Sequence, residues 1–240
     1  MSTFKNQLII ALDVDTVEEA VNLADMLAPF AGGFKVGMQL YNSAGPETVR
    51  RLREKNYPVF IDLKLHDIPN TVAGATRALT RHGASILNVH AAGGREMMIA
   101  AAEAAWDEAA KANIKPPLVV AVTVLTSIGQ IVFNNEIGIP GSIEDRVVTW
   151  ALLAKEAGLD GVVASPWEIA AIRKACGPDF VIITPGVRPA GAATDDQKRT
   201  MTPGEAIRLG ATYLVVGRPV TVAPDPVEAA GAILDGIGES

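Results

Sequence analysis

The fold can be inferred from residues 57–71, which read Tyr57-Pro58-Val59-Phe60-Ile61-Asp62-Leu63-Lys64-Leu65-His66-Asp67-Ile68-Pro69-Asn70-Thr71. The β-branched and aromatic residues at the start of this stretch predict a buried strand that runs into a loop. Because side chains on a strand alternate between its two faces, Asp62 and Lys64 are expected on the same side. Asp67 follows just beyond the strand, where it can fold back toward the Lys64 ammonium.

This charged triplet has two interpretations. Two carboxylates that flank one lysine would keep the lysine protonated at neutral pH and fix its direction. Such an array suits delivery of a proton, or stabilisation of an anion that develops during a reaction. The alternative is a structural cluster of ion pairs at the end of a strand, and the triplet alone does not separate the two.

The same strand pattern, a short and mostly continuous apolar run, recurs about eight times along the chain. Such runs are typical of parallel strands that are covered by helices. No linker divides the 240 residues into two different halves, and 49% of them are hydrophobic, which is enough for a large core. We therefore predict an α/β protein with one domain over residues 1–240, a single (β/α)8 TIM barrel, and keep a doubly wound open sheet as the alternative. The predicted strands are Leu8–Asp13, Gly33–Gly37, Val59–Leu65, Ser85–His90, Leu118–Val124, Gly161–Ala164, Val181–Thr184 and Tyr213–Val216.

Helix-start and helix-stop signals separate the predicted strands. Thr16, Ser165 and Thr202 each precede a helix-like segment with a glutamate three positions later, which is the pattern of a capping box. Asp225-Pro226 places a proline at the first turn of the last predicted helix. Glycines that follow helix-like runs predict where these helices end, at Gly83, Gly158, Gly177 and Gly210.

Polar residues at the C-terminal ends of the strands are the candidates for function, because barrel active sites lie there. Asp13 ends the first strand, where it can bind sugar hydroxyls or simply cap the next loop. Lys35 lies inside the apolar second strand, and burying its charge is costly without a partner such as Asp13, Asp62 or a ligand. Thr126, after the fifth strand, can contact a ligand or cap a helix.

An arginine follows each of the last two strands. Arg188 lies after the seventh strand and Arg218 after the eighth, directly behind Gly217. A guanidinium can bind a phosphate dianion through two parallel hydrogen bonds, and a glycine lets the backbone approach it closely. Since barrels commonly bind phosphate at these two strand ends, the sequence predicts a phosphate site rather than two surface arginines beside turns.

The central segment also carries a family resemblance. Its pattern, Asp62-x-Lys64-x-x-Asp67 followed by Ile68-Pro69-Asn70-Thr71, resembles the signature of the orotidine 5′-phosphate decarboxylase family. The other candidate residues follow in the same order as the motifs of that family. The resemblance implies decarboxylation of orotidine 5′-monophosphate to uridine 5′-monophosphate and CO₂, the last step of de novo pyrimidine synthesis, without a metal or an organic cofactor.

The resemblance implies roles for individual residues. Lys64 would stabilise the carbanion left at C6 and then protonate it, while Asp62 would orient Lys64 near the departing carboxylate. Residues that match Asp13 and Lys35 contact the ribose and complete a network of alternating charges, and the residue that matches Thr126 contacts the substrate. The residues that match the family's 5′-phosphate site are Arg188, Gln197, Gly217 and Arg218.

The resemblance further implies a C2 homodimer with shared active sites. Residues that match Asp67, Ile68 and Thr71 reach the substrate of the neighbouring protomer in this family. Asp67 would then serve the Lys64 of the partner.

Composition excludes several other classes. A net charge of −6 argues against general nucleic-acid binding, which needs a basic face. Cys176 is the only cysteine, so neither an intrachain disulfide nor a thiolate metal site is expected. His66, His82 and His90 lack metal-ligand spacing, so no metal is predicted. There is no apolar run of transmembrane length and no signal-peptide arrangement, which predicts a soluble cytoplasmic protein without a membrane partner.

Two alternative functions remain open. Decarboxylases of 3-keto-gulonate 6-phosphate and hexulose phosphate synthases share the Asp-x-Lys-x-x-Asp strand but use Mg²⁺, and they typically carry an acidic metal ligand where this chain has Lys35. The other alternative is a protein that binds a phosphorylated ligand on the same scaffold without catalysis. The intact Asp62, Lys64 and Asp67 argue against it.

Overall fold

Eight parallel strands form a closed barrel in the computed structural model, which describes residues 6–188 and 201–238. Each strand pairs with its neighbours in sequence, and the first strand pairs with the last. This confirms the predicted (β/α)8 TIM barrel and excludes the open sheet. The strands are β1 (Leu8–Ala11), β2 (Gly33–Gly37), β3 (Val59–Leu65), β4 (Ile86–His90), β5 (Leu118–Val122), β6 (Gly161–Val163), β7 (Val181–Pro185) and β8 (Tyr213–Val216).

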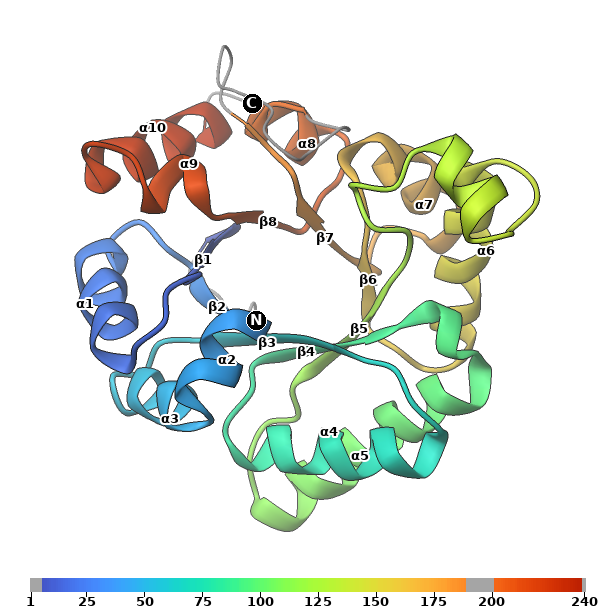
Figure 1. Ribbon diagram of the computed structural model, residues 1–240, viewed down its shortest axis with the longest axis horizontal. Helices are drawn as coiled ribbons and strands as arrows, with labels where there is room; N and C mark the ends of the chain where they lie inside the picture. Colours follow the sequence, from blue (N-terminus) through green and yellow to red (C-terminus); the bar gives the residue numbers. More distant parts are fainter. Residues whose placement is uncertain (1–5, 189–200, 239–240) are drawn as a thin grey trace.

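The helices form a ring around the outside of the barrel (Figure 1). Short helical turns also occur at Ala91–Gly93, Val132–Glu136 and Pro166–Glu168. The α-helices are α1 (Val17–Leu27), α2 (Met38–Ala44), α3 (Glu47–Glu54), α4 (Pro69–Arg81), α5 (Arg95–Ala112), α6 (Ile143–Glu156), α7 (Ile169–Cys176), α8 (Pro203–Arg208), α9 (Arg218–Thr221) and α10 (Pro226–Gly238).

The capping signals are confirmed at two of the three predicted positions. Thr16 and Thr202 form capping boxes with the glutamates three residues later. Ser165 differs, because its side chain accepts a hydrogen bond from the backbone N–H of Trp167 and opens the 3₁₀ turn Pro166–Glu168. The four glycines predicted to end helices all have positive φ, a conformation that favours glycine.

Both faces of the strands are buried, as their continuous apolar runs predict. On β1, Leu8 and Ile10 pack toward the helices, whereas Ile9 belongs to a separate cluster inside the barrel. That inner cluster also contains Phe60 and Val215, which lie below the polar groups at the strand ends. The packed interior is therefore the floor on which the candidate site is built.

One arginine connects two neighbouring βα units at the opposite end of the barrel. The guanidinium of Arg173, on α7, donates to the carbonyl oxygens of Gly177 and Pro178 at 2.8 Å and of Phe180 at 2.7 Å. It also donates to the carbonyl oxygen of Gly210, at the end of α8. This side chain thus holds the loop before β7 against the loop before β8.

In the described part of the chain, no helix combines the length and the apolar character that crossing a membrane requires.

Candidate active site

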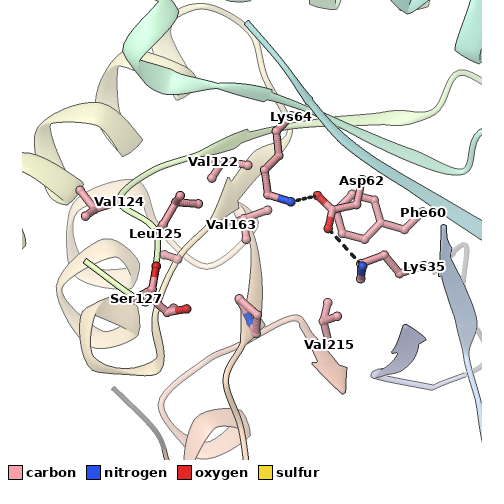
Figure 2. Close-up of a pocket in the computed structure, with 13 residues that line it drawn as sticks. Lys35, Phe60, Asp62, Lys64, Val122, Val124, Leu125, Ser127, Val163 and Val215 are labelled. Carbon is pink, nitrogen blue, oxygen red and sulfur yellow. Dashed lines mark hydrogen bonds and ion pairs between the residues drawn. The ribbon is translucent and has the colours of Figure 1, made fainter. Parts of the chain in front are cut away.

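A cavity of about 240 Å³ opens at the C-terminal ends of the strands (Figure 2). Lys35, Asp62 and Lys64 form one wall, and residues 124–127, which follow β5, form another. The floor is apolar and includes Phe60, Val163 and Val215. This is the end of the barrel at which the sequence predicted the site.

The structure brings four of the predicted charged residues into one row. Lys64 Nζ lies 2.6 Å from Asp62 Oδ1, Lys35 Nζ lies 3.5 Å from Asp62 Oδ2, and Lys35 Nζ lies 3.2 Å from Asp13 Oδ1. The charges alternate along the row from Asp13 to Lys64. The inner pair, Lys35 and Asp62, has side chains that are each only 12% exposed, so these charges neutralise each other away from bulk water.

Asp62 is held as a carboxylate by its neighbours. Burial opposes ionisation of this side chain, but the positive charges of Lys35 and Lys64 and the hydrogen bonds from Lys64 and Asn88 outweigh that cost. The net result is a pKa below the ordinary value of an aspartate. A negative charge therefore faces the cavity at neutral pH.

Lys64 reaches Asp62 through an irregular backbone rather than through simple strand alternation. Its φ is +53°, in the left-handed region that is uncommon for residues other than glycine. The pairing of β3 with β4 shifts between Ile61 and Leu65. The expected proximity of Asp62 and Lys64 is correct, but the regular pleat assumed for it is wrong, since a bulge sets the direction of Lys64.

Asn88 contacts this bulge. From the sequence, alternation along the fourth strand places Asn88 and His90 on the same face, so that either could line the site, but it does not predict contacts with β3. The Asn88 side chain lies within β4, is 1% exposed, and makes hydrogen bonds to both Asp62 and Lys64. A polar amide between the apolar Leu87 and Val89, in the middle of the strand, was the available signal.

Gly37 is a residue of the site that the sequence reasoning missed. A Cβ atom at this position would lie 2.7 Å from Lys35 Nζ and 3.4 Å from Asp13 Oδ1. A side chain would thus displace the ammonium that joins Asp13 to Asp62. Gly217, which was predicted, borders the Asp13 carboxylate, because a Cβ there would lie 3.4 Å from Asp13 Oδ2.

Asp67, Ile68 and Thr71 lie at the start of α4, exposed on the surface of the protomer. Asp67 Oδ1 accepts a hydrogen bond from the backbone N–H of Ile68 at 2.7 Å. Within the described residues of this single chain, Asp67 makes no ion pair with Lys64, so the predicted fold-back onto its own lysine is not observed. Ile68 is 67% exposed, which is high for a large apolar side chain.

The other predicted binding residues lie around the same end of the barrel. Thr126 lines the cavity. Arg188 follows β7 and is 8% exposed, and its backbone N–H donates to the Met201 carbonyl oxygen at 3.0 Å. Gly217 caps α9, which begins at the exposed Arg218. Gln197 falls within residues 189–200, outside the described residues.

Two histidines meet beside the bulge, although they are far apart in sequence. The ring centroids of His66 and His90 are 5.4 Å apart. Burial, followed by the nearby charges of His66 and Lys64, lowers the pKa of His90. The described residues contain no group of three or more His, Cys, Asp or Glu side chains that could hold a metal ion.

His90 should make the folded protein lose stability as the pH falls below about 6.5, the ordinary pKa of histidine. The unfolded chain takes up a proton there, whereas the folded chain resists protonation until its lower pKa is reached. The slope for one proton is at most about 1.4 kcal/mol per pH unit. Urea unfolding at pH 7, 6 and 5 should show a flatter pH dependence for His90→Asn than for the exposed control His82→Asn. Equal slopes in the two variants would contradict this assignment.

Comparison with known proteins places this site in a family. The model of the "Orotidine 5′-phosphate decarboxylase / HUMPS family" matches residues 6–233. The chain belongs to this family. It is 59% identical to a protein from Moorella thermoacetica named orotidine 5′-phosphate decarboxylase, over 95% of this chain and 91% of the relative. A protein of the same name from Heliobacterium modesticaldum is 53% identical, over 98% of this chain and 97% of the relative.

Solved structures in the family have the same fold. The crystal structure of orotidine 5′-phosphate decarboxylase from Lactobacillus acidophilus superposes with a TM-score of 0.86 at 37% identity, and the match covers 97% of this chain and 99% of that one. The family membership and the barrel that the sequence predicted are therefore both confirmed.

Proposed function

We propose that this protein is an orotidine 5′-phosphate decarboxylase that converts orotidine 5′-monophosphate to uridine 5′-monophosphate and CO₂, the last step of de novo pyrimidine synthesis. The observation that carries the proposal is the alternating row of Asp13, Lys35, Asp62 and Lys64 on one wall of the cavity. The names of relatives more than 50% identical over nearly the whole chain support it. The reaction needs neither a metal nor an organic cofactor.

Lys64 is the proton donor in this proposal. The bond between C6 and the carboxylate carbon breaks, CO₂ departs, and the electron pair stays on C6. The Lys64 ammonium stabilises this developing anion and then transfers a proton to C6. The neutral amine regains a proton from solvent after the product leaves. The 2.6 Å contact with Asp62 keeps the ammonium directed into the cavity before reaction.

Asp62 lies beside the carboxylate that departs. Its lowered pKa keeps a negative charge there, so a bound substrate carboxylate is repelled while the Lys64 ammonium is held in place. This repulsion disappears as CO₂ forms, because CO₂ is uncharged. The remaining member of the row, Lys35, neutralises Asp62 from the other side and joins Asp13 in contacting the ribose.

The phosphate and the base are held by groups away from C6. Arg188, Gln197, Gly217 and Arg218 bind the 5′-phosphate, and Thr126 contacts the pyrimidine. Binding energy from these remote contacts places C6 against Lys64.

A homodimer completes the site. Asp67, Ile68 and Thr71 of each protomer reach the substrate of the partner, with Asp67 next to the partner's row of charges. Their exposure on the free protomer, including the 67% exposed Ile68, supports this assignment. The protein acts in the cytoplasm on a small nucleotide, without a nucleic-acid or membrane partner.

The main alternative is the Mg²⁺-dependent group named above, the 3-keto-gulonate 6-phosphate decarboxylases and hexulose phosphate synthases. The matched family description also covers a second group, abbreviated HUMPS. The Mg²⁺-dependent relatives typically carry an acidic ligand where this chain has Lys35. Here the Lys35 ammonium lies 3.5 Å from Asp62 and 3.2 Å from Asp13, so a positive charge already lies between the two carboxylates. This arrangement opposes a divalent cation and favours the metal-independent reaction.

The loss of absorbance on mixing purified protein with orotidine 5′-monophosphate in EDTA tests the proposal. Rapid conversion to uridine 5′-monophosphate is the expected result. Turnover of a sugar phosphate with Mg²⁺, without conversion of the nucleotide, would assign the chain to the sister group. Tight nucleotide binding without turnover would support a binding protein instead.

Arg218→Ala should raise the KM for orotidine 5′-monophosphate by roughly 10- to 100-fold, the value of a lost charge-assisted hydrogen bond. Slow turnover of orotidine, which lacks the phosphate, should stay unchanged, since Arg218 acts only through that group. Arg208→Ala is the matched control, because Arg208 is an exposed arginine in the last turn of α8. An equal loss with both substrates would remove Arg218 from the phosphate site.

A further inference from the structure

Asn88 occupies an unusual place in the barrel. It lies in the middle of β4 and is 1% exposed, next to the irregular part of β3. Ile61 pairs with Leu87, and the next pair is Leu65 with Val89. Three residues of β3, from Asp62 to Lys64, therefore lie opposite the single residue Asn88. A regular ladder of backbone hydrogen bonds cannot form across this mismatch.

The Asn88 side chain fills the gap in the ladder. Its Oδ1 accepts a hydrogen bond from the backbone N–H of Lys64 at 2.8 Å. Its Nδ2 donates to Asp62 Oδ1 at 2.7 Å, the same oxygen that receives the Lys64 ammonium at 2.6 Å. Only one orientation of the amide offers an acceptor to the N–H and a donor to the carboxylate. One side chain thus fixes both the backbone of Lys64 and the carboxylate that receives its ammonium.

The conformation of Lys64 needs such support. A lysine with φ of +53° is locally unfavourable and persists only where surrounding contacts impose it. The hydrogen bond to Asn88 satisfies a backbone N–H that β4 itself leaves without a partner in the ladder. Removal of the amide would let the backbone of Lys64 relax and would move its ammonium.

We propose that Asn88 is a positioning residue for the decarboxylation: its amide holds the bulge at Lys64 and the Asp62 carboxylate in register, so that the Lys64 ammonium meets C6. Asn88 does not itself touch the reacting atoms. This inference rests on the proposed function of Lys64 and adds a residue on which that function depends.

Two substitutions separate the two hydrogen bonds. Asn88→Ala removes both, whereas Asn88→Asp keeps an acceptor for the Lys64 N–H and replaces the donor with a second carboxylate. Both should lower kcat roughly 100-fold with a much smaller change in KM, because a misplacement of about 1 Å has an effect of this size. In Asn88→Asp, carboxylates at positions 62 and 88 share a proton. The acid limb of the pH–rate profile of Asn88→Asp should therefore move to higher pH. The acid limb of Asn88→Ala should move less.

Ser85→Ala is the matched control. Ser85 is 8% exposed and precedes β4, and its Oγ accepts a hydrogen bond from the backbone N–H of Val59 at 3.2 Å. It therefore supports the same two strands at their other end. If Asn88 were merely structural, Ser85→Ala and Asn88→Ala would lower stability alike and leave kcat per folded molecule unchanged, and that result would overturn the proposal.

A measurement without turnover keeps this test separate from the proposed function. The carboxyl ¹³C resonance of Asp62 reports its pKa in the full-length protein. This pKa should be higher in Asn88→Ala than in the wild type, because a donor to the carboxylate is lost, and unchanged in Ser85→Ala. An unchanged value in Asn88→Ala would refute the positioning role. A wild-type protein that fails to convert orotidine 5′-monophosphate would instead refute the proposed function.

Discussion

Lys64→Ala should lower kcat for orotidine 5′-monophosphate by roughly 10⁴-fold or more, the largest effect expected of any single substitution. The substitution removes the proton donor and the positive charge nearest the carbanion together. It also leaves Asp62 with Lys35 as its remaining ion-pair partner in the row. Binding of the product, uridine 5′-monophosphate, should weaken far less, since the phosphate contacts remain.

A second substitution at this position separates charge from proton transfer. Lys64→Arg keeps a positive charge, but a guanidinium does not release a proton in the working pH range. It should therefore remain nearly as inactive as Lys64→Ala. Lys55→Ala is the control, because Lys55 is an exposed lysine that pairs with Asp25 at 3.0 Å, away from the cavity. Steady-state kinetics and product titration measure both effects, and more than one-tenth of wild-type kcat in Lys64→Ala would remove this lysine from the mechanism.

Arg173→Ala should have the largest effect on stability, a loss of about 2–4 kcal/mol in the free energy of unfolding. Its guanidinium donates to four backbone carbonyls in the loops before β7 and β8. Three of these four contacts are part-buried, and each carbonyl oxygen left unsatisfied there adds a desolvation cost. Urea unfolding measures the loss, and kcat at low temperature should be unchanged, because Arg173 lies at the opposite end of the barrel from the cavity.

An exposed arginine provides the contrast. Arg50 pairs with Glu47 and Glu54 on the surface of α3, and all three side chains are exposed. Such pairs add little to stability, because water and salt screen them. Arg50→Ala should therefore leave the urea midpoint nearly unchanged, although it breaks two ion pairs. A comparable loss of unfolding free energy in both variants would show that the carbonyl contacts of Arg173 stabilise the fold no more than exposed ion pairs do.

The barrel itself was predictable because its strands are continuous apolar runs between capping signals. Each described strand lies within two residues of its predicted range, and the differences fall at strand ends such as Asp13 and Val124. These ends are hard to place from sequence, since pairing with a neighbouring strand decides where a strand stops. The strand and helix periods are local properties, and local properties can be read from one sequence.

The charged residues of the candidate site were predictable from the sequence, but the residues that hold them in place were not. Charged residues in apolar strands, such as Lys35, are conspicuous because their burial needs a partner. The role of Asn88 depends on a bulge in the neighbouring strand, and no local pattern in residues 59–65 predicts that bulge. Gly37 was missed for a related reason, because the place of the Lys35 ammonium that excludes its Cβ is set by contacts with Asp13 and Asp62, which are distant in sequence.

At Lys64, catalytic activity requires a lysine in a left-handed backbone conformation that lowers the stability of the fold. Holding a residue other than glycine at positive φ costs about 1–3 kcal/mol, and glycine removes much of that cost. Glycine at position 64 would relieve this strain, but it would remove both the proton donor and the ion pair with Asp62. Heat-adapted forms that still work must gain their extra stability at other positions, such as the helix ends and the loops that face away from the cavity.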